Sequence, residues 1–222
     1  MHLVLVLDRS GSMQKVHGDA LGAVNSYIEA AKKDAALKSS CFSLITFSSE
    51  SVDTIRRDLP IEEVKPVTVE EYRCSGWTPL YDAIGRGIEL LDEAVGPNKH
   101  AKAALVIMTD GQENSSLEFN HDGINAMIEA RKEQGWMLVF LGDGLNVAKQ
   151  GAALGTTAAN VASYLGGVGL RAAVGVVGQS LSSYASSKGW AGRLATANKG
   201  FTAEQRDELT RKEEKKAEGQ LE

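Results

Sequence analysis

Short apolar runs alternate with helical patterns along most of the chain, and this alternation limits its possible folds more than any other feature. The runs 3–7, 103–108 and 136–141 are almost entirely apolar, as expected for strands buried on both faces of a sheet. Between the first two runs, residues 15–36 place apolar side chains at helical spacing. The pattern predicts an α/β fold: a Rossmann-like, doubly wound, mostly parallel sheet with helices on both faces and right-handed crossovers.

One pair of runs predicts an exception to the parallel arrangement. Residues 41–48 and 52–59 both have strand character and are separated only by Ser49-Glu50-Ser51, which suits a hairpin. The second run is polar, as an edge strand would be, so we expect one antiparallel edge strand. The other expected elements are helices over 80–95, around 124–135 and over 147–154, and a short last strand near 159–162.

The character of the chain changes beyond Ser163, where Gly, Ala and Ser become frequent. We expect a main domain over 1–165 and a helical extension over 166–210 that packs on it. Within the extension, 189–200 is expected to be a loop. Thr202 is a good N-cap for a final helix, with Gln205 as its capping-box partner. The Lys/Glu-rich tail, 211–222, is expected to be mobile.

Composition restricts the classes of function. The net charge of −5 at pH 7 argues against a sequence-independent nucleic-acid binder, which is usually basic. The apolar run 3–7 is too short for a signal peptide, and no run reaches the length of a membrane span. We therefore expect a cytoplasmic protein that uses neither a membrane nor nucleic acid as its partner. Cys41 and Cys74 are not in a C-x-x-C pair, and the histidines lack metal-ligand spacing, so the sequence does not support zinc or redox chemistry.

Three polar loops are expected to meet at the carboxyl edge of the sheet. Residues 8–12 (Asp-Arg-Ser-Gly-Ser) follow the first strand, 76–80 (Gly-Trp-Thr-Pro-Leu) open a helix, and 109–111 (Thr-Asp-Gly) follow a central strand. In open α/β sheets, ligands bind at this edge where the strand order reverses. The loops offer only hydroxyl and carboxylate oxygens, which suit Mg²⁺, Mn²⁺ or Ca²⁺. Taken singly, each loop would more often be an Asx turn or a helix N-cap.

The set of motifs resembles the metal-ion-dependent adhesion site of von Willebrand factor A-type domains. Asp8-x-Ser10-x-Ser12, then Thr78, then Asp110 occur in the family's order on the expected elements. The stretches 78–83 (Thr-Pro-Leu-Tyr-Asp-Ala) and 109–111 also match the family's pattern. The resemblance covers about residues 1–165 and is closest in kind to stand-alone cytoplasmic members of bacteria and phages.

The resemblance implies specific roles for the five residues. Ser10, Ser12 and Thr78 would contact the metal, Mg²⁺ above all, with Mn²⁺ or Ca²⁺ as alternatives. Asp8 and Asp110 would hold it through water or accept hydrogen bonds from coordinating groups. Neutral hydroxyls leave the charge of the cation poorly neutralised, so a carboxylate from a partner can fill an open coordination position.

The function implied is that of a non-enzymatic, metal-dependent protein-binding module. Its partner would be a protein presenting an Asp or Glu carboxylate, such as an ATPase or an assembly subunit. Two alternatives stay open: a structural component with a stabilising metal, and a metal-assisted hydrolase, for which the sequence supplies no distinct base beyond Asp8 and Asp110. Asp143 follows another strand and could shape the rim of the site, and Trp77 would be an interface anchor if it faces outward.

A glycine-rich stretch gives a weaker signal. Gly166, Gly167 and Gly169 resemble a dinucleotide loop, but they lie inside a helical pattern late in the chain rather than between a strand and a helix. Close packing of a helix is the better interpretation.

Overall fold

The computed structural model describes residues 1–98, 100–164, 166–202 and 204–205. Its centre is a six-stranded sheet in the order β3-β2-β1-β4-β5-β6. The strands are β1 (His2–Asp8), β2 (Cys41–Ser48), β3 (Ser51–Pro60), β4 (Ala103–Thr109), β5 (Met137–Asp143) and β6 (Val161–Tyr164). Only the β2–β3 pair is antiparallel. The predicted α/β fold, with one antiparallel edge strand from a hairpin, is confirmed.

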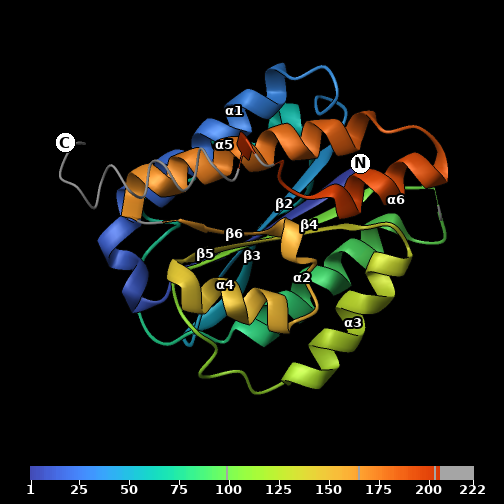
Figure 1. The fold of residues 1–222 in the computed structure, drawn as a ribbon. Coiled ribbons are helices and arrows are strands. Elements are labelled where there is room, and N and C mark those ends of the chain that lie inside the picture. The colour runs from blue at the N-terminus through green and yellow to red at the C-terminus, as the bar shows by residue number, and fades with distance from the viewer. Residues whose placement is uncertain (99, 165, 203, 206–222) are drawn as a thin grey trace.

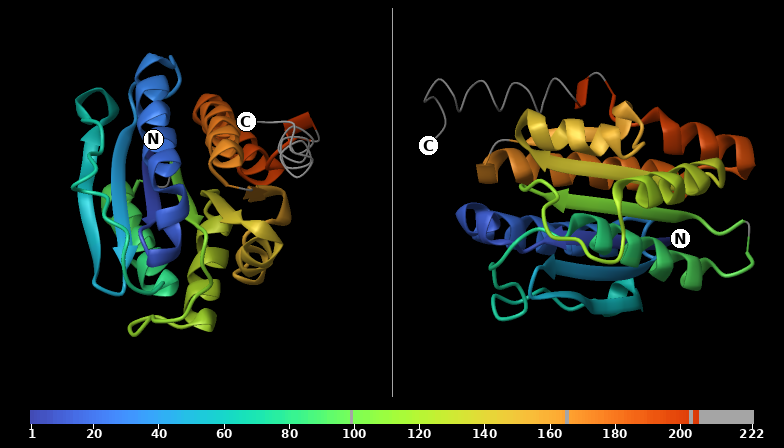
Figure 2. Two further views of the ribbon diagram at one scale, coloured as in Figure 1. Left: turned by 90° about the vertical axis from the view of Figure 1, so that its left-hand side faces the viewer. Right: turned by 90° about the horizontal axis from the view of Figure 1, so that it is seen from below.

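Helices cover both faces of the sheet (Figure 1). On one face lie α1 (His17–Lys33), α5 (Gly166–Ser186) and α6 (Gly189–Lys199); on the other lie α2 (Leu80–Val95), α3 (His121–Glu133) and α4 (Gly144–Ala153). Short 3₁₀ segments occur at Gly11–Val16, Ile61–Glu63 and Ala158–Asn160. Seen from below, the strands lie side by side, and α2 and α3 lie in front of them (Figure 2, right).

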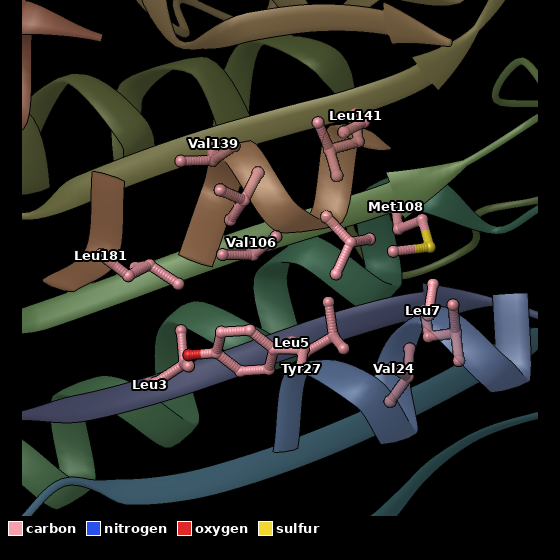
Figure 3. Packing of buried hydrophobic residues seen from close by; sticks show 14 of the residues in the cluster. Leu3, Leu5, Leu7, Val24, Tyr27, Val106, Met108, Val139, Leu141 and Leu181 are labelled. Atoms are coloured by element: carbon pink, nitrogen blue, oxygen red, sulfur yellow. The ribbon is translucent and has the colours of Figure 1, made fainter. Parts of the chain in front are cut away.

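Alternation along each strand divides the core into two clusters. Leu3, Leu5 and Leu7 face α1 and α5, whereas Val4 and Val6 face α2. Because side chains of successive strand residues point to opposite faces, an uninterrupted apolar run is needed when both faces are covered. Figure 3 shows the first cluster, where Tyr27 of α1 and Leu181 of α5 lie over the leucines of β1 and Val106 of β4.

Helix α5 completes this first cluster. Its residues Leu170, Val174, Val177 and Leu181 are all buried. A Cβ added at Gly178 would lie 3.5 Å from the ring of Tyr27, and one at Gly167 would collide with Asp19 of α1. The contact at Gly178 would be an ordinary one, whereas Gly167 lets α5 approach α1 closely, as the sequence predicted for this stretch.

Two predictions of secondary structure were wrong: the bounds of one helix, and one segment predicted to be a loop. The first predicted helix, 15–36, is shorter: a 3₁₀ turn occupies Gly11–Val16, and α1 ends where Asp34 adopts an extended backbone. The predicted loop at 189–200 is instead α6, whose Gly189 and Gly192 disguise its helical pattern. A tertiary contact helps to hold α6, because the buried Arg193 guanidinium donates to the Ala101 carbonyl at 3.0 Å. Within the helix, the same guanidinium lies 4.7 Å from the centre of the Trp190 ring.

The predicted capping box is present. The backbone nitrogen of Gln205 donates to Thr202 Oγ1 at 3.2 Å, and the backbone nitrogen of Thr202 donates to Gln205 Oε1 at 2.7 Å. The helix predicted to follow it and the tail 211–222 fall outside the described residues. No helix in the described ranges is both long and apolar enough to cross a membrane.

Candidate metal site

The structure brings the five predicted residues together, and we refer to them as the oxygen cluster. Its members are Asp8, Ser10, Ser12, Thr78 and Asp110. Ser12 Oγ donates to Asp110 Oδ1 at 2.5 Å and lies 3.1 Å from Ser10 Oγ. A Cβ added at Gly111 would lie 2.8 Å from Thr78 Oγ1 and 3.6 Å from Ser12 Oγ, so both hydroxyls approach this glycine. All five residues sit at the carboxyl edge between β1 and β4, where the strand order reverses.

Backbone hydrogen bonds join the three loops. Gly11 N donates to the Gly76 carbonyl at 3.0 Å, and Ser75 N donates to the Arg9 carbonyl at 2.8 Å. Thr78 N donates to Asn114 Oδ1 at 2.8 Å, while Asn114 N donates to the Thr78 carbonyl at 3.2 Å. Because each loop is bonded to a neighbour, the hydroxyls are positioned before any ligand arrives.

Asp8 is the most buried member of the cluster, with no exposed surface. Its Oδ1 accepts from Ser10 N at 2.6 Å and its Oδ2 from Thr109 Oγ1 at 2.5 Å. Burial raises the pKa of Asp8 to about 6, against the lowering effect of these hydrogen bonds. Burial also raises the pKa of Asp110, and the nearby charge of Asp143 adds to that rise.

This arrangement fits a divalent cation. Within the described part of the chain, no basic side chain forms an ion pair with Asp8 or Asp110. Arg9, although next in sequence, points away and donates to Ser51 Oγ at 2.6 Å and Asp53 Oδ2 at 3.2 Å. A buried carboxylate is costly unless a charge compensates it, and oxygen donors suit Mg²⁺ or a similar hard ion.

Other residues that support the site were not assigned roles from the sequence. The Tyr72 hydroxyl, fully buried, donates to the Asp8 carbonyl at 2.7 Å. Glu113 accepts from the amides of Tyr81 and Ser116, and so fixes the loop after β4 to the start of α2. Among the supporting residues, only Thr109 could have been found from the sequence, because it belongs to the Thr-Asp-Gly motif at 109–111. Tyr72 and Asn114 lie far from their partners in sequence, so no local pattern marks them.

The raised pKa of Asp8 predicts how pH changes the stability of the metal-free protein. The folded-state pKa of Asp8 is about 6, whereas its ordinary value is 3.8, so the charged form of this buried acid destabilises the fold by roughly 3 kcal/mol. This destabilisation is present above pH 6 and disappears as the pH falls from about 6 to about 4. The contribution of Asp8 should therefore make the free energy of unfolding, measured with urea in EDTA, higher at about pH 5 than at about pH 7.

Asp8→Asn should remove most of this pH dependence, because the amide is neutral at both values. Asp122→Asn is the control, since that side chain is fully exposed. If the free energy of unfolding of Asp8→Asn depended on pH as that of wild type does, another group would be responsible.

Comparison with known proteins identifies the fold. The family model described as von Willebrand factor type A domain matches residues 2–164. The structure of proximal thread matrix protein 1 from the mussel byssus is similar, with a TM-score of 0.60 and 18% identity over 80% of this chain. The pilus adhesin SpaC from Lactobacillus rhamnosus GG, in its open conformation, has a TM-score of 0.60 and 14% identity over 82% of this chain.

At these identities the two structures support the fold alone. The chain corresponds to 46% of the length of the byssus protein and 30% of that of the adhesin. No curated protein matches the chain.

Proposed function

The chain belongs to the von Willebrand factor type A domain family, whose members commonly mediate protein–protein interaction or adhesion, and on that premise we propose that it is a metal-dependent protein-binding module. A divalent cation, Mg²⁺ above all, is held by the oxygen cluster and accepts a carboxylate oxygen from an Asp or Glu of a partner protein. The observation that carries this proposal is the buried carboxylate of Asp8, which has no ion pair among the described residues, beside the linked hydroxyls of Ser10 and Ser12.

The hydroxyls and the carboxylates of the cluster have different roles in holding the cation. The hydroxyl oxygens of Ser10, Ser12 and Thr78 are neutral metal ligands, whereas Asp8 and Asp110 supply the negative charge. Asp110 already accepts a hydrogen bond from Ser12, so it can orient that hydroxyl oxygen toward a cation. A cation bound mainly through neutral oxygens keeps a net positive charge that attracts an acidic partner.

An exposed aromatic side chain beside the cluster suits a protein partner. Trp77, directly before Thr78, is 67% exposed. The backbone of Trp77 is fixed, because its amide donates to Ser49 Oγ at 2.8 Å and its carbonyl accepts from Ser49 N at 2.9 Å. A large aromatic side chain on a fixed backbone is the kind of anchor that contributes most to binding at interfaces.

The test is partner capture from the source cell, with the wild-type chain as bait in Mg²⁺ or in EDTA. Mg²⁺ should increase the recovery of specific proteins, and EDTA or Asp110→Ala should abolish it, because the bridging cation is lost. Asp122→Ala, at a fully exposed carboxylate, is the matched control and should behave as wild type. Calorimetry with Mg²⁺ should show affinity reduced by about ten- to a hundredfold in Asp110→Ala.

Trp77→Ala separates metal binding from partner binding in the same assay. It should lower partner recovery while leaving the Mg²⁺ affinity unchanged. Recovery of the same proteins by wild type and Asp110→Ala, with or without metal, would contradict the bridging role. Mg²⁺ binding without any effect on recovery would indicate a purely stabilising metal.

A further inference from the structure

Three residues from three adjacent strands meet at the end of the sheet opposite the oxygen cluster. His2 begins β1, Cys41 begins β2, and Asp58 lies near the end of β3. One ligand atom from each, His2 Nδ1, Cys41 Sγ and an Asp58 carboxylate oxygen, lies within 4.8 Å of the others. His2 Nδ1 and Asp58 Oδ1 are 2.7 Å apart. The two clusters are separated by the length of β1, about 20 Å at a rise of about 3.3 Å per residue.

The strand register explains why these residues share one face. His2 and Cys41 are direct partners in the parallel β1–β2 ladder. His2 alternates with Leu3, which faces α1 and α5, so His2 and Cys41 point to the face covered by α2. No local spacing in the sequence reveals this pair, because the two residues meet only through the ladder.

A bulge in β3 brings the third residue to the same place. Phe42 pairs with Leu59 but Leu44 pairs with Arg56, so β3 carries an extra residue opposite Ser43. Asp58 takes up this irregularity with a φ of 45°, the only positive φ among the described non-glycine residues. Its amide donates to Ser43 Oγ at 2.8 Å. A left-handed conformation is uncommon outside glycine, and such bulges often redirect a side chain.

We propose that His2, Cys41 and Asp58 form a second metal site, selective for a zinc-class ion. Imidazole nitrogen, thiolate sulfur and carboxylate oxygen are the three ligand types that zinc uses, and sulfur is not a ligand for Mg²⁺. In a tetrahedral zinc site, bond lengths of 2.0–2.3 Å place neighbouring ligand atoms about 3–4 Å apart. To reach this geometry, His2 Nδ1 and Asp58 Oδ1 would separate slightly from 2.7 Å, and Cys41 Sγ already lies within 4.8 Å of both. A fourth position stays open to solvent or another ligand.

Such a site would join the first strand to the edge strand. β3 pairs with β2 alone, and β1 does not contact it in the ladder. An ion bound by one residue from each of the three strands would fasten the edge of the sheet. The site is independent of the proposed partner-binding function, because it shares no residue with the oxygen cluster.

Cobalt titration tests the site, since thiolate ligation of Co²⁺ gives a near-ultraviolet charge-transfer band that oxygen ligation does not. The protein carries no affinity tag, and millimolar Mg²⁺ is present to occupy the oxygen cluster. Wild type should develop the band, and stoichiometric Zn²⁺ should remove it. Cys41→Ser should abolish the band and weaken Zn²⁺ binding at least about tenfold, whereas Cys74→Ser should leave both unchanged.

His2→Gln and Asp58→Asn keep the thiol and should each weaken Zn²⁺ binding by at least about tenfold. His121→Gln, at an exposed histidine at the start of α3, should have no effect. These variants also guard against a folding defect in Cys41→Ser. The proposal is overturned if wild type gives no band, if the band survives Cys41→Ser, or if His2→Gln binds Zn²⁺ as tightly as wild type.

Discussion

A chain that stops at Tyr164, where the family match ends, should fail to fold into a stable monomer. Helix α5 lies beyond that point and buries Leu170, Val174, Val177 and Leu181 against the sheet and α1. Each truncated apolar side chain typically costs about 2–5 kcal/mol. Loss of all four approaches the whole stability of a typical domain, about 5–15 kcal/mol.

Circular dichroism and size-exclusion chromatography will measure the effect. The matched control is a chain that ends at Gln205, which keeps α5, α6 and the bond from Gln205 Nε2 to Gln179 Oε1. This control should unfold cooperatively as a monomer. A milder variant, Leu181→Ala, should stay folded but lose about 2–5 kcal/mol in urea unfolding. A monomeric, cooperatively unfolding 1–164 fragment would show that the sheet tolerates an open face.

Replacing Gly87 by leucine should weaken both the fold and the oxygen cluster. Helix α2 lies so close to the sheet at this residue that an added Cβ would be 2.9 Å from both Leu105 Cδ1 and Val6 Cγ2. Overpacking of this kind typically costs about 1–3 kcal/mol and forces elements apart. Because Thr78 lies just before α2, a displaced helix should also move its hydroxyl and lower the affinity for Mg²⁺.

Gly22→Ala in α1 is the control for Gly87→Leu. Nothing lies within 4 Å of a Cβ added at Gly22, so alanine should stabilise α1 by about 0.5–1 kcal/mol. For each variant, the melting temperature without Mg²⁺ measures the stability of the fold, and its rise on adding Mg²⁺ measures the binding of the ion. If Gly87→Leu melts like wild type, the contact between α2 and the sheet is looser than these distances indicate.

The oxygen cluster could be located from the sequence because its residues follow strands or lie just before a helix. Asp8 ends β1, Asp110 follows β4, and the carboxyl ends of parallel strands share one edge. The sequence could not reveal Tyr72 or Asn114, because their contacts depend on how long loops return to the sheet edge. Trp77 was predicted only conditionally as an anchor, since burial of a loop residue depends on its tertiary surroundings.

The errors in secondary structure have a similar cause. Helix α6 contains two glycines in its first turns, so intrinsic propensity argues against it. It forms because Ala197 enters the core and the Arg193 guanidinium finds a carbonyl acceptor on another segment. The capping box at Thr202 was predictable because both of its partners lie within one helical turn.

The central position of β1 also sets the order in which the nascent chain can fold. β1 pairs with β2 on one side, but its other neighbour is β4, and His2 pairs with Ala103. At about 5–20 residues per second, a ribosome needs roughly 5–20 s to synthesise the intervening chain. Until Asp110 is synthesised, Asp8 therefore lies at the end of a strand whose β4 edge is unpaired. An ion held by the oxygen cluster, as proposed, would stabilise only a chain whose central strands have already paired.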